Sequence, residues 1–100
     1  DSLVVIEKID KQITRDLNSI TEGLNGASMR LAVKLVEAMT AQPLQSVSTV
    51  AAITGRTFAN ANQLVGKLEG LGILREITGR KRNRRYCYAP LVELLAPAGP

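Results

Sequence analysis

The middle of the chain holds two helical patterns separated by one glycine, Gly55. The first pattern is short, covers residues 49 to 54 and has Ser48 as its expected cap. The second pattern begins after an expected cap at Thr57 and ends near residue 71. Because glycine fits the left-handed backbone at the end of a helix, the sequence predicts a helix-turn-helix. The apolar side of its second helix consists of Ala61, Leu64, Val65, Leu68 and Leu71.

A β-hairpin is expected directly after this second helix. Branched residues favour a strand over residues 73 to 78, and a returning strand is expected over residues 84 to 88. Residues 79 to 83 would form the tip of the hairpin. A helix-turn-helix followed by a two-stranded hairpin is the winged-helix arrangement. The predicted fold class is therefore mainly α with a small β-hairpin, a winged helix-turn-helix preceded by a long N-terminal helix.

Helices are also expected toward both ends of the chain. Residues 3 to 24 have aliphatic side chains at spacings of three and four, which predicts a long amphipathic helix. Its apolar stripe either packs on the core of this domain or forms a seam with another domain or a second chain. Another helix is expected over residues 28 to 41, with Ser28 as its cap and Pro43 beyond its end. A short amphipathic helix is expected after Pro90.

The expected organisation has three parts. Residues 1 to 26 form a linker or dimerisation helix, residues 27 to 96 form the winged helix-turn-helix domain, and residues 97 to 100 form a disordered tail. A chain of 100 residues suits one domain with a modest core.

The composition argues against enzyme and metal chemistry within this chain. It has no histidine and one cysteine, Cys87, so the commonest general base and the usual zinc ligands are missing. We expect that thiol to be buried and unreactive, and we expect no catalytic residue, metal, cofactor or small-molecule ligand. No apolar run approaches the roughly 20 residues that cross a bilayer. A cytoplasmic location without membrane contact is therefore expected.

Positive charge is concentrated at the tip of the expected hairpin. The formal net charge is +4, and 5 of the 13 Lys and Arg residues lie in residues 79 to 85. In a winged helix, these side chains would neutralise DNA phosphates while the second helix enters the major groove. A solvated loop that keeps the protein soluble is the alternative interpretation. The candidate phosphate contacts are Arg80, Lys81, Arg82, Arg84 and Arg85, and the candidate recognition-helix residues are Arg56, Thr57, Asn60, Gln63 and Lys67.

Two functions are compatible with this pattern. The first is a module that binds double-stranded DNA, which would associate with the nucleoid in the cytoplasm and regulate transcription. The second is a protein-interaction or dimerisation module, in which the long first helix forms a homodimer or the domain recruits a target protein. Asn62 lies beside the apolar side of the second helix, and a hydrogen bond to the backbone at the turn is one role for it.

The stretch "ANANQLVGKLEGLGILREITGRKRNRRYCYAPLVELL" contains several short motifs in a fixed order. It resembles the C-terminal winged-helix domain of Fic-family proteins, and the resemblance extends over roughly residues 28 to 95. That domain has an Ala-Asn pair in its recognition helix, an "LGIL-x-E-x-TGRKRNR" turn, an aromatic strand and a closing "LxxLL"-like helix. Cys87 departs from the pattern, since another strand former is expected there. The matching residues are Ala61, Asn62, Leu71 to Leu74, Glu76, Thr78 to Arg84, Tyr86 and Tyr88.

The resemblance implies that the chain is the regulatory C-terminal module of a Fic-like protein, or alternatively a module that positions the catalytic domain of that protein or recruits its target. Fic proteins transfer AMP from ATP to hydroxyl side chains of target proteins. They use a His-Pro-Phe-x-(Asp/Glu)-Gly-Asn-Gly-Arg loop, in which the histidine is the base. This chain contains neither that loop nor any histidine, so the activity would belong to the parent protein and not to these residues.

Overall fold

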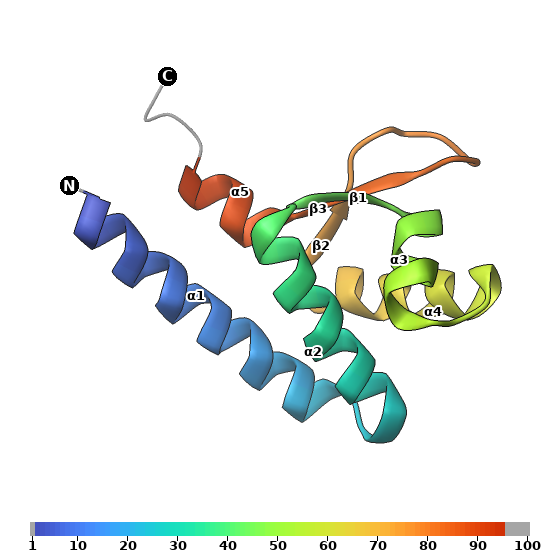
Figure 1. Ribbon diagram of the computed structural model, residues 1–100, viewed down its shortest axis with the longest axis horizontal. Helices are drawn as coiled ribbons and strands as arrows, with labels where there is room; N and C mark the ends of the chain where they lie inside the picture. Colours follow the sequence, from blue (N-terminus) through green and yellow to red (C-terminus); the bar gives the residue numbers. More distant parts are fainter. Residues whose placement is uncertain (1, 96–100) are drawn as a thin grey trace.

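The structure is a computed structural model that describes residues 2–95 of the chain. Two long helices pack antiparallel beside a smaller unit made of two helices, three strands and a closing helix (Figure 1). The predicted disordered tail, residues 97–100, lies outside the described residues. The elements follow in the order α1 (Ser2–Gly23), α2 (Gly26–Ala41), β1 (Leu44–Ser46), α3 (Val47–Thr54), α4 (Phe58–Gly70), β2 (Leu74–Glu76), β3 (Arg85–Tyr88) and α5 (Ala89–Leu95).

This order and packing are those of a winged helix-turn-helix preceded by a long helix, so the predicted fold class is confirmed. The turn between α3 and α4 follows the sequence prediction closely. Gly55 ends α3 in the left-handed conformation, with φ 66° and ψ 22°, and its N–H donates to the Ala51 carbonyl. Thr57 caps α4, because its side-chain oxygen accepts a hydrogen bond from the Asn60 N–H at 3.2 Å.

Two other predicted caps are wrong. The structure begins α3 at Val47, and the Ser46 hydroxyl, rather than Ser48, accepts the Thr49 N–H at 3.2 Å. Ser46 has extended backbone angles because it is also the last residue of β1, and an extended residue before a helix is in position to cap it. Likewise, α2 begins before Ser28, at Gly26, and has Asn25 in the cap position without a side-chain hydrogen bond.

The sheet has one more strand than the sequence predicted. Strand β1 pairs antiparallel with β3, and β3 pairs antiparallel with β2, which gives the order β1-β3-β2. Leu44 lies opposite Cys87 in one pair and Leu74 lies opposite Tyr88 in the other. The expected two-stranded hairpin is therefore present, but its second strand is the centre of a three-stranded sheet.

One hydrophobic core joins the helices to the sheet. It buries Tyr86 and Tyr88 on the same strand, while Cys87 between them is also buried, as expected for its thiol. Successive side chains of a strand point to opposite faces, so β3 is covered on both sides. The core consists of Ile20, Ala32, Leu35, Val36, Met39, Val47, Val50, Ala61, Leu64, Val65, Leu68, Ile73, Leu74, Tyr86, Tyr88 and Leu91.

A buried polar contact attaches α1 to the sheet. The Tyr88 hydroxyl donates a hydrogen bond to Asp16 Oδ2, and Gln12 Nε2 donates to Asp16 Oδ1 at 3.0 Å. Burial and the neighbouring carboxylate raise the pKa of Tyr88 far above its ordinary value. The C-terminal half of α1 is therefore part of this domain, with Ile20 fully buried in the core.

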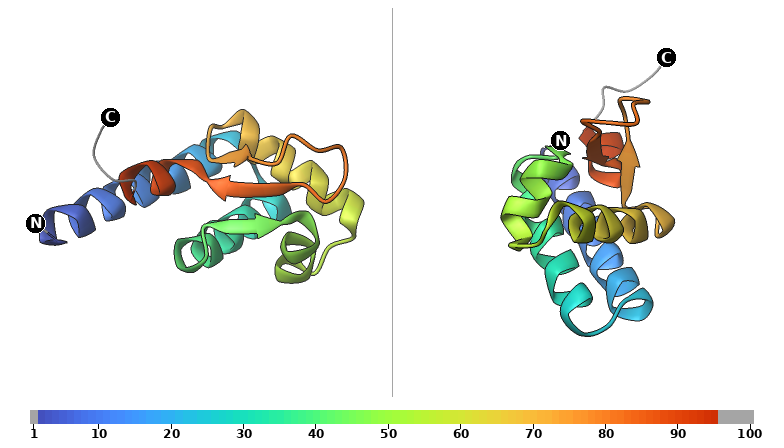
Figure 2. Two further views of the ribbon diagram at one scale, coloured as in Figure 1. Left: turned by 90° about the horizontal axis from the view of Figure 1, so that it is seen from above. Right: turned by 90° about the vertical axis from the view of Figure 1, so that its right-hand side faces the viewer.

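The N-terminal end of α1 is different. It extends past α2, and α5 packs against the helix on one side (Figure 2). Val4, Val5 and Ile6 are exposed there, by 45%, 37% and 55% of their surfaces. The C-terminal half of the apolar stripe thus packs on the core of this domain, whereas a seam between the N-terminal half and another domain or chain stays a prediction.

Candidate nucleic-acid interface

The wing of this fold is the hairpin loop between β2 and β3, residues 77 to 84, together with Arg85 at the start of β3. It rises from the sheet and passes beside the N-terminal end of α4 (Figure 2). Its predicted phosphate contacts, Arg80, Lys81, Arg82, Arg84 and Arg85, are all exposed.

None of these five cations makes a salt bridge with another described residue. Within residues 2–95 the only salt bridge joins Arg75 to Glu93, at 3.2 Å, and neither belongs to the wing. Arg84 Nε donates to the Arg80 carbonyl at 2.6 Å, which folds the guanidinium back over the loop without cancelling its charge. The wing therefore presents a concentrated positive surface to solvent.

Glu76 shapes the entry to the wing. Its carboxylate accepts hydrogen bonds from the Thr78 N–H, the Thr78 hydroxyl and the Gly79 N–H, the last at 2.9 Å to Oε1. The Thr78 hydroxyl is the largest cause of the lowered pKa of Glu76, and the charge of Arg84 contributes. Gly79 has φ 66°, a left-handed conformation that glycine adopts without strain, and Asn83 has φ 54° near the other end of the loop. The tip thus has a defined shape, although it is exposed.

Helix α4 presents a buried side, an outward side and two flanks. Its buried side contains Ala61, Leu64, Val65 and Leu68, as predicted. The opposite side, at helical spacings of four and three, consists of exposed and mostly small residues: Ala59, Gln63, Gly66 and Gly70. Between these sides lie two flanks, and each flank borders a hollow.

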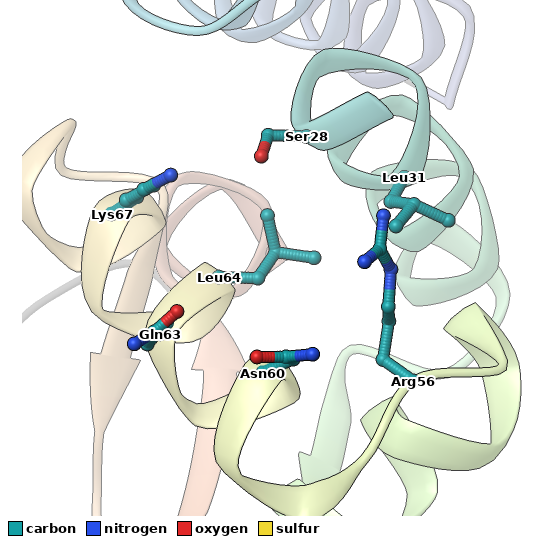
Figure 3. A pocket seen from close by; sticks show the side chains of 7 residues that line it. All are labelled: Ser28, Leu31, Arg56, Asn60, Gln63, Leu64 and Lys67. Carbon is teal, nitrogen blue, oxygen red and sulfur yellow. The ribbon is translucent and has the colours of Figure 1, made fainter. Parts of the chain in front are cut away.

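One hollow lies between α4 and the N-terminal turns of α2, and we call it the α2–α4 pocket. Figure 3 shows Arg56 and Lys67 extending from two sides toward this part of α2, with Leu64 between them. Asn60 and Gln63 complete its polar rim. The structure thus brings together four of the five predicted recognition-helix residues. The fifth, Thr57, is exposed at the start of α4, where its hydroxyl caps the helix. The pocket is lined by Ser28, Leu31, Arg56, Asn60, Gln63, Leu64 and Lys67.

The other flank faces the wing across two hollows that share four lining residues, and we call them together the wing groove. The shared residues are Val47, Phe58, Asn83 and Arg84. The larger hollow adds Asn62, Lys81 and Arg82, and the smaller adds Ser46, Ser48, Arg80 and Arg85. All five wing cations therefore border the same groove as α4.

Neither Phe58 nor Asn62 was among the predicted DNA contacts, although Asn62 belongs to the Ala-Asn pair that carries the family resemblance. Phe58 precedes the buried Ala61 by three positions, so helical spacing places it beside the apolar side of α4 and gives no sign that it is exposed. A hydrogen bond to backbone at the turn was one role considered for Asn62. Its side chain is exposed and makes no hydrogen bond within the described part of the chain. These two residues lie near cations only because the wing borders the same hollow as α4.

Metal sites and membrane spans are both absent from the described residues. Across residues 2–95 no group of three or more histidine, cysteine, aspartate or glutamate side chains is arranged to hold a metal ion. None of the described helices is long and apolar enough to cross a membrane. Comparison of the chain with known protein families, curated proteins and solved structures finds no match.

Proposed function

We propose that this chain is a double-stranded DNA-binding module, with α4 as the helix that enters the major groove and the wing on the neighbouring phosphates. The observation that carries the proposal is the set of five exposed wing cations, none in a salt bridge within residues 2–95, bordering the same groove as α4. Phosphate oxygens along one DNA strand offer a matching row of negative charges.

The shape of α4 supports the same function. The major groove is about 12 Å wide, and an α-helix with its side chains measures about 10–12 Å across, so the two fit. Ala59, Gly66 and Gly70 have a methyl group or no side chain on the outward side of α4, so the helix backbone can approach base edges closely. Gln63 on that side, and Asn60 and Arg56 on the α2 flank, have the amide and guanidinium groups that read adenine and guanine.

Binding to a mixed-sequence duplex, followed by fluorescence anisotropy over a series of salt concentrations, tests the proposal. Each phosphate contact contributes roughly 0.9 to the slope of log affinity against log salt. Replacing Arg80, Lys81 and Arg82 by alanine should therefore weaken binding at low salt and reduce the slope by up to about 2.7.

The chain offers a matched control for the loss of three charges. Lys8, Lys11 and Arg15 lie together on α1, beside Leu94 of α5 and outside the wing groove. Their triple alanine variant should keep the wild-type slope. Equal losses in the two variants would mean that net charge alone governs binding, and no binding by the wild type at low salt would reject the DNA proposal.

A second function, protein interaction through α1, is favoured by the exposed Val4, Val5 and Ile6 at its N-terminal end. Two such helices that pack across a two-fold axis would cover these side chains. Sedimentation equilibrium should then show a dimer that Ile6→Glu converts to a monomer. A wild-type monomer at high micromolar concentration would argue against this interface.

The resemblance to Fic-family C-terminal domains extends both proposals to a parent protein. In such a protein the module would regulate or position a catalytic domain that transfers AMP. The sequence that precedes Asp1 in the parent tests this, because a Fic protein has its histidine-containing loop there.

A further inference from the structure

Phe58 is the one large apolar side chain of α4 that the fold leaves in solvent. It is the first residue of the helix, and 56% of its surface is exposed, whereas Leu64, Val65 and Leu68 are buried. An exposed aromatic ring is weak evidence by itself, since many apolar side chains lie on protein surfaces. The surroundings of this ring make it informative.

The ring lies in the wing groove, where cations surround it. Phe58 lines both hollows of the groove, and every one of the five wing cations lines at least one of them. Val47, which is buried at the start of α3, adds a second apolar wall. A partner that fits this groove therefore combines negative charge with a small apolar group close to it.

Asn62 belongs to the same flank, one helical turn beyond Phe58. Its exposed amide borders the larger hollow and has no hydrogen-bond partner within the described residues. Four residues along a helix rise about 6 Å, and base pairs are spaced about 3.4 Å apart, so Phe58 and Asn62 reach base pairs one or two steps apart.

We propose that Phe58 and Asn62 are specificity-determining residues for DNA, with Phe58 against the 5-methyl group of a thymine and Asn62 on an adenine edge. This inference rests on the proposed function. In the major groove, thymine is the base that presents a methyl group, and it lies beside the phosphates that the wing cations would bind. Asparagine forms a bidentate pair with N6 and N7 of adenine. The flank of α4 that faces the wing thus selects A·T-containing sites.

The test compares duplexes that differ only in the thymine methyl group. Duplexes that bind the wild-type protein are first selected from a random pool. Each is then prepared in two forms, one with thymine and one with uracil at every thymine position, and the affinity of each form is measured by fluorescence anisotropy. The wild type should bind the uracil duplexes about three- to tenfold more weakly. Phe58→Ala should bind both forms equally, at the level of wild type on uracil DNA, whereas Phe58→Leu should still distinguish them.

Leu95→Ala is the matched control. Leu95 lies in α5, has 55% of its surface exposed and does not line the wing groove, so its loss should leave the preference for thymine intact. Circular dichroism melts of all variants should coincide within a few degrees, because each altered side chain is exposed.

The outcomes separate this inference from the proposed function. Two results would overturn the assignment of Phe58 and leave DNA binding in place. In the first, wild-type binding depends on salt but is equally strong for thymine and uracil duplexes. In the second, Phe58→Ala lowers the affinity for both duplexes by the same factor and so keeps the preference for thymine. No binding of any duplex rejects both proposals. If, in addition, an acidic peptide with an aromatic anchor binds the wild type and not Phe58→Ala, the groove is a protein-docking site.

Discussion

Two carboxylates, Asp16 and Glu76, accept different kinds of hydrogen bond at opposite ends of the sheet. Asp16 is 6% exposed and accepts the Tyr88 hydroxyl, a contact that joins α1 to β3 across 72 positions of the chain. Glu76 is partly exposed and accepts hydrogen bonds only from residues two and three positions away, and these bonds shape the start of the wing. The first carboxylate joins distant parts of the domain, and the second shapes a loop whose cations make no salt bridge within residues 2–95.

The largest expected effect comes from Tyr88→Phe, which removes the donor to buried Asp16. A buried acceptor left without its partner costs about 1–3 kcal/mol, so the free energy of unfolding should fall by that amount in urea titrations. Tyr86→Phe is the control, because Tyr86 is also buried but its hydroxyl makes no hydrogen bond in the described part of the chain. Equal losses in the two variants would show that the contact with Asp16 contributes nothing.

The same contact predicts a loss of stability in alkali. The pKa of Tyr88 is raised in the folded state, so the stabilisation is complete below the ordinary tyrosine value of 10.0 and is lost as the pH rises above it. Thermal midpoints measured between pH 8 and about pH 11 should therefore fall more steeply for wild type than for Tyr88→Phe. Parallel curves for the two proteins would contradict the raised pKa.

A smaller and purely local effect is expected for Glu76→Ala. Loss of the carboxylate frees the Thr78 and Gly79 N–H groups, so their hydrogen exchange should become several-fold faster while the unfolding midpoint changes little. Because the pKa of Glu76 is lowered, wild-type protection of these amides should persist at pH 4.5 and disappear as the pH falls further. Glu69→Ala on the exposed side of α4 should leave both amides unchanged. A global loss of stability in Glu76→Ala would remove the contrast with Asp16.

The sequence predicted those parts of the fold that depend on neighbours in the chain. The turn between α3 and α4 follows from Gly55 and from the cap at Thr57, and both act within a few residues. The buried side of α4 follows from helical spacing alone. The wing follows from a basic run between two strands.

The parts that the sequence did not predict depend on contacts between distant segments. Strand β1 has only three residues, and its partner β3 lies about forty positions further along, so no local pattern marks it. Because Ser46 ends that strand, Ser46 caps α3, and not Ser48 as the sequence predicted. Phe58 and Asn62 border the wing groove only because the wing lies across a hollow from α4. Asn60, Gln63 and Lys67 do line one pocket together with Arg56, and their contact with DNA stays a prediction.

The central claim is that α4 and the wing together form one surface for duplex DNA, and amide chemical-shift mapping tests it most directly. A titration of ¹⁵N-labelled protein with a short mixed-sequence duplex should shift the amides of residues 56 to 67 and 79 to 85, and leave those of α1 and α5 unchanged. Shifts confined to α1 and α5, or no shifts at low salt, would contradict the account.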